Sequence, residues 1–221
     1  PAWWSTVLDN LGPGWTYTIA AQAGSGMLNR GNLRPTDLGE LDATNGRCNG
    51  TTFGDRLGEV TAARPTLLIV EGGRNDFKKC VGGAIRRSTE AETATAIGQY
   101  LRDLGSVADS IDLPRRSVYV MAPWGVTFEG QRDVVTFEME RSARAEGFAY
   151  VPLPVFVKQE TVDGTHPTDA GSRRLAARLL AASDLRRFAP VGTAAAPTPA
   201  AASSPSSWSM PMLSKPSSLA P

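Results

Sequence analysis

One short stretch of the sequence, VDGTHP at residues 162–167, holds the only histidine of the chain, His166. Asp163 precedes His166 by three residues, and an aspartate at that spacing on one turn can accept a hydrogen bond from the imidazole ring. Such a bond selects one tautomer and leaves the other ring nitrogen to act as a general base. The plainer interpretation is that His166 is a surface or core residue and that Asp163 is a turn residue ahead of Gly164.

Two glycine-rich segments carry groups that suit the same chemistry, AGSG at 23–26 and EGGRND at 71–76. Glycine turns let backbone N–H groups approach a developing oxyanion, and the side chain of Asn75 offers one more donor. Each segment also has a structural interpretation, in which the glycines form turns and Asn75 caps a helix. Taken together with Asp163 and His166, however, they predict an acyl-transfer site.

Predicted strands place these three segments at one edge of a sheet. Each segment follows a strand, and ligands of open parallel sheets bind beyond the carboxyl ends of the strands. The run TLLIV is uninterrupted and apolar, as in a strand buried on both faces, and Thr89 with Glu92 has the pattern of a capping box. The predicted strands are 16–21, 66–70, 117–122 and 148–153, and the predicted helices are 2–11, a short one near 53–60, 89–108, 131–146 and 168–182. This alternation predicts an open α/β domain with a parallel sheet.

The motifs GGRND at 72–76 and DGTHP at 163–167 resemble the third and fifth conserved blocks of the SGNH, or GDSL-type, hydrolases. AQAGSG at 21–26 is similar to the second block. The resemblance covers residues 2 to 183 and implies a flavodoxin-like three-layer α/β/α fold and a serine esterase, lipase or deacetylase without a cofactor. It also implies that Gly24 and Asn75 donate to the oxyanion, that His166 is the general base and that Asp163 orients it. The implied substrate is an acyl ester of a small molecule, lipid or carbohydrate. The acyl acceptor is either water, in a hydrolase, or an alcohol, in a transferase.

The first block of that family, a Gly-Asp-Ser sequence that supplies the nucleophile, does not occur in the chain. The favoured explanation is that the nucleophile and the central first strand lie upstream of Pro1. The alternatives are a circular permutation, for which SSWSMPML is a poor strand, a substitute nucleophile at Ser25, and a catalytically silent binding module. If the first strand is lacking, we expect strands 16–21 and 66–70 to be separated by a gap or to pair directly.

Composition divides the chain into a domain at 1–187 and a tail at 188–221. The tail is almost entirely Ala, Pro and Ser, and such a segment cannot bury enough apolar surface to fold alone. We therefore predict that it is a flexible, disordered tail.

Charge and cysteine content exclude several classes of partner. The net charge is +1, which gives no reason to expect nucleic acid, and the apolar runs are too short to span a membrane. One histidine and two cysteines, Cys48 and Cys80, do not make a metal cluster. The two cysteines are either free thiols or a disulfide, and a disulfide would indicate an exported protein.

Overall fold

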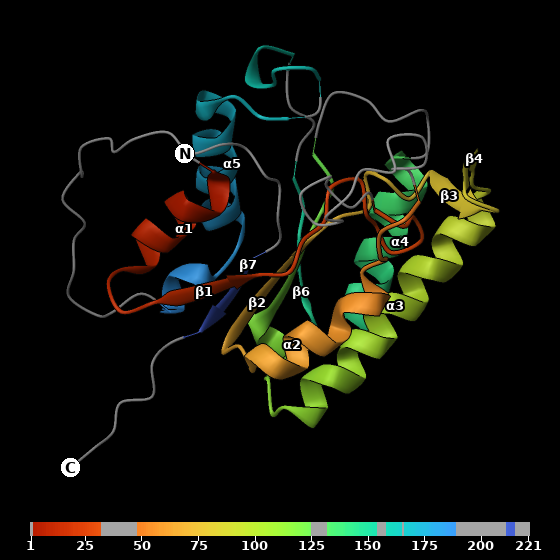
Figure 1. The fold of residues 1–221 in the computed structure, drawn as a ribbon. Helices are drawn as coiled ribbons and strands as arrows, with labels where there is room; N and C mark the ends of the chain where they lie inside the picture. Colours follow the sequence, from red (N-terminus) through yellow and green to blue (C-terminus); the bar gives the residue numbers. More distant parts are fainter. Residues whose placement is uncertain are drawn as a thin grey trace, which may run out of the picture.

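The computed structural model describes residues 2–31, 48–124, 132–153, 158–164, 166–188 and 211–214. The protein is a mixed α/β domain with a five-stranded sheet of order β1-β7-β2-β5-β6 and a separate pair, β3-β4 (Figure 1). The strands are β1 Thr16–Ile19, β2 Leu67–Glu71, β3 Lys78–Val81, β4 Ala84–Arg87, β5 Val118–Met121, β6 Ala149–Val151 and β7 Pro211–Ser214. The helices are α1 Trp3–Leu11, α2 Leu57–Ala63, α3 Glu90–Ser110, α4 Arg132–Ala145 and α5 Asp169–Ala182, with short 3-10 helices at η2 Gly54–Arg56, η3 Arg115–Ser117, η4 Lys158–Glu160 and η5 Leu185–Phe188.

Strands β2, β5 and β6 form a parallel unit. Leu68 pairs with Val118, and Tyr119 pairs with Ala149. Every residue of β5 and the first four of β2 are buried. The continuous apolar sequence of these strands is what a parallel strand covered on both faces requires. The predicted α/β architecture with a parallel sheet is therefore confirmed.

Helices cover both faces of this unit, as Figure 1 shows. On one face, α1 and α5 pack against the side chains of Leu67 and Ile69. On the other face, α2, α3 and α4 pack against Leu68 and Val70. Successive side chains of a strand point to opposite faces, so β2 contributes alternate residues to each core.

The longest helix, α3, begins where the sequence predicts. Thr89 is the N-cap, and its side chain accepts a hydrogen bond from the backbone N–H of Glu92. The carboxylate of Glu92 in turn accepts a bond of 2.9 Å from the backbone N–H of Thr89. The predicted capping box is confirmed, and it satisfies N–H groups that the first turn of a helix leaves without intrahelical partners.

The arrangement of β1 and β2 differs from the sequence-based expectation, which was that a gap separates the two strands or that they pair directly. β7 lies between them and pairs antiparallel with both. The expectation is therefore wrong. The assessment of SSWSMPML as a poor strand is also wrong for its last three residues, 211–213, which lie in β7. The expectation failed because two facing strand edges offer backbone hydrogen bonds that local propensity does not register.

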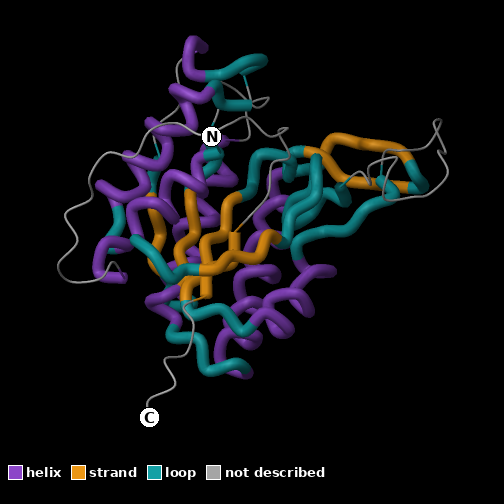
Figure 2. The backbone as a smooth tube through the Cα atoms, turned by 60° about the vertical axis from the view of Figure 1, so that its left-hand side comes forward, coloured by secondary structure: helices purple, strands orange, loops and turns teal. Residues whose placement is uncertain are grey.

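The β3–β4 hairpin was not predicted from the sequence. It stands out from the main sheet, as Figure 2 shows. Its strands are joined by Gly82 and Gly83, which have φ angles of +58° and +77°. A Gly-Gly pair between two short extended runs is a known signal for a two-residue hairpin turn, because both central residues need positive φ.

Replacing Thr89 with Ala tests the capping box. We expect a loss of about 1 kcal/mol in the free energy of unfolding, because the side-chain acceptor for the first turn of α3 is removed. Urea denaturation followed by circular dichroism measures the loss. The matched control is Thr61→Ala on α2, which removes an exposed threonine and should change stability by less than about 0.5 kcal/mol. Equal stability of the two variants would contradict the role of the capping box.

Candidate functional site

The Asp163–His166 pair lies in the loop that leads from β6 to α5. His166 Nδ1 is 2.7 Å from Asp163 Oδ2, and the backbone N–H of His166 donates to Asp163 Oδ1 at 2.8 Å. One carboxylate thus holds both the ring and the backbone of the same histidine. Both side chains are about half exposed, at 51% for Asp163 and 47% for His166. Because Nδ1 faces the carboxylate, Nε2 is the ring nitrogen that a general-base role would use.

The backbone of this loop closes into a compact turn. The N–H of Val162 donates to the carbonyl of His166 at 2.7 Å, and the N–H of Gly164 donates to Thr161 Oγ1 at 3.0 Å. Gly164 has a φ of +82°, a conformation that glycine adopts without strain. These bonds, together with the bond from the His166 N–H to the Asp163 carboxylate, set the spacing between Asp163 and His166.

Arg74 connects this loop to the end of β2. Its Nη1 donates to the carbonyl of Trp124 at 3.0 Å, and its Nη2 lies 3.5 Å from the carbonyl of Gly164. Burial lowers the pKa of Arg74, while the nearby charges of Glu71 and Asp163 raise it. Arg74 thus brings together the ends of β2 and β5 and the loop that carries Asp163. The sequence analysis gave Arg74 no role, although it lies inside the GGRND motif.

Gly24 and Asn75 also lie close to each other. Gly24 has a φ of +71°, and its carbonyl accepts a hydrogen bond from Asn29 Nδ2 at 2.8 Å. Asn75 Nδ2 donates to the carbonyl of Ser25 at 3.0 Å, which joins the end of β2 to the turn that follows β1. A carboxamide carries two N–H donors, so this bond uses one of them. The roles of Gly24 and Asn75 as oxyanion donors remain predictions.

Ser25, the fallback nucleophile, lies in surroundings that do not suit that role. Its side chain is 6% exposed, and its hydroxyl donates to the carbonyl of Gln22 at 2.7 Å. It also accepts from Arg56 Nη2 at 2.9 Å. A serine nucleophile needs its proton directed at a base, whereas here the hydroxyl holds a turn together.

Asp76 organises the turn that follows β1, and the sequence analysis missed this role. Its side chain is fully buried and accepts hydrogen bonds from the backbone N–H groups of Met27, Leu28 and Asn29, at 3.1, 2.6 and 3.1 Å. Burial raises the pKa of Asp76, and the three backbone bonds oppose that rise. A Cβ on Gly26 would lie 2.3 Å from Asp76 Oδ1, so this approach requires glycine. The only signal in the sequence was a charged residue directly after Asn75.

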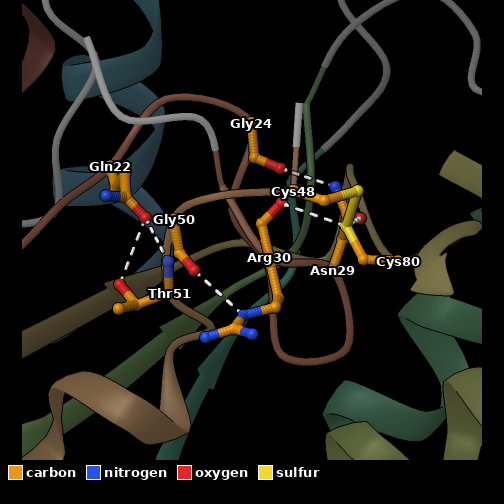
Figure 3. Close-up of a disulfide and its surroundings, with 8 residues drawn as sticks. All are labelled: Gln22, Gly24, Asn29, Arg30, Cys48, Gly50, Thr51 and Cys80. Atoms are coloured by element: carbon orange, nitrogen blue, oxygen red, sulfur yellow. Dashed lines mark hydrogen bonds between the residues drawn. A yellow bond between two sulfur atoms is a disulfide. The ribbon is translucent and has the colours of Figure 1, made fainter. Parts of the chain in front are cut away.

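The disulfide between Cys48 and Cys80 joins the segment before η2 to β3 (Figure 3). The segment around Cys48 is also held to the turn after β1, because the N–H of Thr51 donates to Gln22 Oε1 at 2.6 Å. A cross-link over 32 residues stabilises a fold by about 3 to 4 kcal/mol in the chain-entropy model. The disulfide therefore ties the segment that begins at Cys48 to the β3–β4 hairpin.

Trp124, which follows β5, belongs to the core. It is 5% exposed and makes an edge-to-face contact with Trp3 at a centroid distance of 6.1 Å.

Comparisons with family models and with curated proteins found no match. No family model matches the chain, and no curated protein matches it. Within the described ranges, none of the helices is long and apolar enough to cross a membrane. The same residues contain no group of three or more His, Cys, Asp or Glu side chains that could hold a metal ion.

Replacing Asp76 with Asn tests the anchoring of the turn. A carboxamide has one acceptor oxygen and would direct an N–H group at backbone donors, so we expect a loss of about 2 kcal/mol in the free energy of unfolding. Urea denaturation measures it. Asp103→Asn, on the exposed face of α3, is the matched control and should cost less than about 0.5 kcal/mol. If Asp76→Asn is as stable as this control, the turn does not depend on the carboxylate.

The pKa of Glu71, the last residue of β2, leads us to expect that the stability of the fold depends on pH. Burial raises its pKa to about 7, against the opposing effect of Arg74. Because the folded-state pKa lies above the ordinary value of 4.5, the folded protein binds this proton more tightly than the unfolded chain does. The contribution to stability is therefore complete below pH 4.5 and is lost as the pH rises to about 7.

The variant Glu71→Gln should remove this contribution. We expect wild type to lose on the order of 3 kcal/mol relative to Glu71→Gln between pH 4.5 and pH 7.5. Urea denaturation of both proteins at several pH values measures the difference. The control is Glu90→Gln, which changes an exposed residue at the start of α3 and should have the same pH profile as wild type. Parallel pH profiles for wild type and Glu71→Gln would show that Glu71 titrates normally in the fold.

Proposed function

We propose that this chain carries the acid–base and oxyanion groups of a serine ester hydrolase with the flavodoxin-like fold of the SGNH hydrolases. The observation that carries the proposal is the 2.7 Å contact between His166 Nδ1 and Asp163 Oδ2 in a loop beyond a parallel strand. Support also comes from Asn75 and Gly24, which lie together beyond the ends of two other strands. The substrate class is an acyl ester of a small molecule, lipid or carbohydrate.

In this mechanism His166 moves one proton in each half of the reaction. Its Nε2 takes the proton of the attacking serine hydroxyl as the hydroxyl oxygen bonds to the acyl carbon. The carbonyl oxygen becomes an oxyanion, which the side chain of Asn75 and the N–H of Gly24 stabilise. When the ester C–O bond breaks, His166 returns the proton to the leaving alcohol. A water, or an acceptor alcohol in a transferase, then attacks the acyl-enzyme by the same route.

The nucleophile of this reaction is not assigned to a position in the chain. The sequence has no Gly-Asp-Ser, and the hydroxyl of Ser25 is bonded to Gln22 and Arg56 rather than to a base. This observation favours a second candidate function, a binding module that keeps these groups and does not catalyse.

We further propose that the protein is exported. The Cys48–Cys80 disulfide supports this proposal, because disulfides persist mainly in oxidising compartments.

The test is hydrolysis of p-nitrophenyl acetate by the full-length protein as wild type and as its His166→Ala and Asp163→Asn variants. We expect activity in wild type, a loss of at least 100-fold in His166→Ala and a smaller loss in Asp163→Asn, because the base remains but is oriented less well. Circular dichroism should show all three folded alike, since both side chains are half exposed. A fluorophosphonate probe, which reacts with nucleophilic serines, followed by mass spectrometry would identify the serine.

The opposite results separate the two functions. Activity that survives in His166→Ala would contradict the proposed mechanism. An inactive wild type that still binds an acyl ester saturably, measured by calorimetry, would assign the chain to the binding module.

A further inference from the structure

The β3–β4 hairpin concentrates positive charge. Between Phe77 and Thr89 the chain has four basic residues and no acidic one, and all four lie on the two strands. The net charge of the whole chain is only +1, so it does not reveal this local concentration. The four residues are Lys78, Lys79, Arg86 and Arg87.

The register of the hairpin places like charges opposite each other. Lys78 pairs with Arg87, and Lys79 pairs with Arg86. Like charges directly opposite on two strands destabilise the pairing. The hairpin therefore gains no stability from these cross-strand pairs, and an anionic partner would relieve the repulsion within them.

The acidic residues at the start of α3 do not cancel this charge. Lys79 forms an ion pair with Glu92 in the first turn of α3, and that turn also holds Glu90. On the disulfide side, the exposed Arg30 lies next to the hairpin, because Cys80 Sγ is 3.9 Å from the carbonyl oxygen of Arg30. The basic residues of the hairpin thus outnumber the carboxylates of that turn, and Arg30 adds to the excess.

The tip of the hairpin is apolar and exposed. Residues 80–85, CVGGAI, contain no charged side chain, and Cys80 is held in the disulfide. Val81 is 50% exposed, and residues 82–84 are exposed as well. An apolar end flanked by Lys and Arg suits the surface of an anionic membrane, where the apolar part is buried at the acyl boundary and the cations are attracted to the lipid headgroups.

The spacing within the hairpin fits the depth of that boundary. Lys79 precedes Gly82 by three residues, and Arg86 follows Gly83 by three. A strand rises about 3.3 Å per residue, so these cations lie about 10 Å behind the tip. Interfacial segments bury their apolar part about 5–10 Å into the boundary of headgroups and acyl chains. A tip at that depth leaves the cations level with the headgroups.

The domain holds the hairpin in a fixed direction. The disulfide joins Cys80 to Cys48, and at the base the N–H of Ser88 donates to the carbonyl of Phe77 at 3.0 Å. A two-stranded hairpin alone is at best marginally stable, yet this one stands out from the main sheet (Figure 2). A projection that is already ordered binds a surface without the entropic cost of ordering it.

We propose that the β3–β4 hairpin docks the protein on an anionic membrane surface. Val81 and the Gly-Gly turn would lie at the acyl boundary, and the four basic residues would contact the lipid headgroups. Attachment is peripheral and reversible, because a few cations and one short apolar tip supply it. The inference does not depend on ester hydrolysis.

The experiment uses the full chain and vesicles of two compositions, phosphatidylcholine alone and equal parts of phosphatidylcholine and phosphatidylglycerol. Cosedimentation measures the bound fraction. We expect wild type to bind the anionic vesicles at least tenfold more tightly than the neutral ones. Raising the salt concentration from about 0.1 M to about 1 M should weaken that binding, because the Debye length falls from about 10 Å to about 3 Å.

Two variants locate the binding on the hairpin. Lys78→Gln combined with Arg86→Gln removes two of the four cations and should weaken binding to anionic vesicles at least tenfold. Val81→Asn keeps the charge and should weaken binding about threefold or more, because a carboxamide at the acyl boundary is costly. The matched control, Arg116→Gln combined with Arg173→Gln, removes two exposed cations from η3 and α5 and should bind like wild type. Circular dichroism checks that the variants fold alike.

Three results would overturn the proposal. One is the absence of any preference of wild type for the anionic vesicles, a result that does not require a variant to fold. Another is an equal loss of binding in the hairpin double variant and in its control, which would assign the effect to net charge. The third is binding to soluble heparin as tight as to the anionic vesicles, with no effect of Val81→Asn on either, which would assign the hairpin to a soluble polyanion.

Discussion

The three hydrogen bonds that the buried Asp76 carboxylate accepts hold together the part of the molecule on which the candidate site depends. They fix the backbone of Met27, Leu28 and Asn29, and through that turn they set the position of Gly24. Asp76 is also tied to the start of α3, because its carbonyl accepts from Ser88 and Thr93 hydroxyls at 2.7 Å. A buried charge is tolerated when several donors satisfy it, and it then specifies one backbone arrangement.

The groups proposed to act on an ester are held by different physical means. Gly24 and Asn75 lie on backbone that buried polar bonds make rigid, whereas Asp163 and His166 lie on a half-exposed turn. Arg74 bonds to the carbonyl of Gly164 in that turn and joins it to the sheet. In the proposed hydrolysis, buried and part-buried hydrogen bonds would fix the two oxyanion donors, whereas solvent would reach the Asp163–His166 pair.

In the sheet, β7 provides the backbone hydrogen-bonding partner for the facing edges of β1 and β2. Strands β2, β5 and β6 follow the order that alternating strands and helices predict, and β1 runs parallel to them because β7 is antiparallel to both β1 and β2. A proline-containing strand in such a place shows how strongly exposed backbone groups of two strands compel pairing.

The sequence by itself determined the parallel α/β architecture, the start of α3 and the local Asp163–His166 spacing. These features depend on residues close in the chain, namely apolar runs, the Thr89–Glu92 capping pattern and one short turn. Only the tertiary structure decided which distant groups meet: Asp76 with the turn after β1, Arg74 with the loop before α5, and β7 with β1 and β2. Those contacts join segments tens of residues apart or more, and no local pattern records them, because backbone donors and acceptors look the same in every sequence.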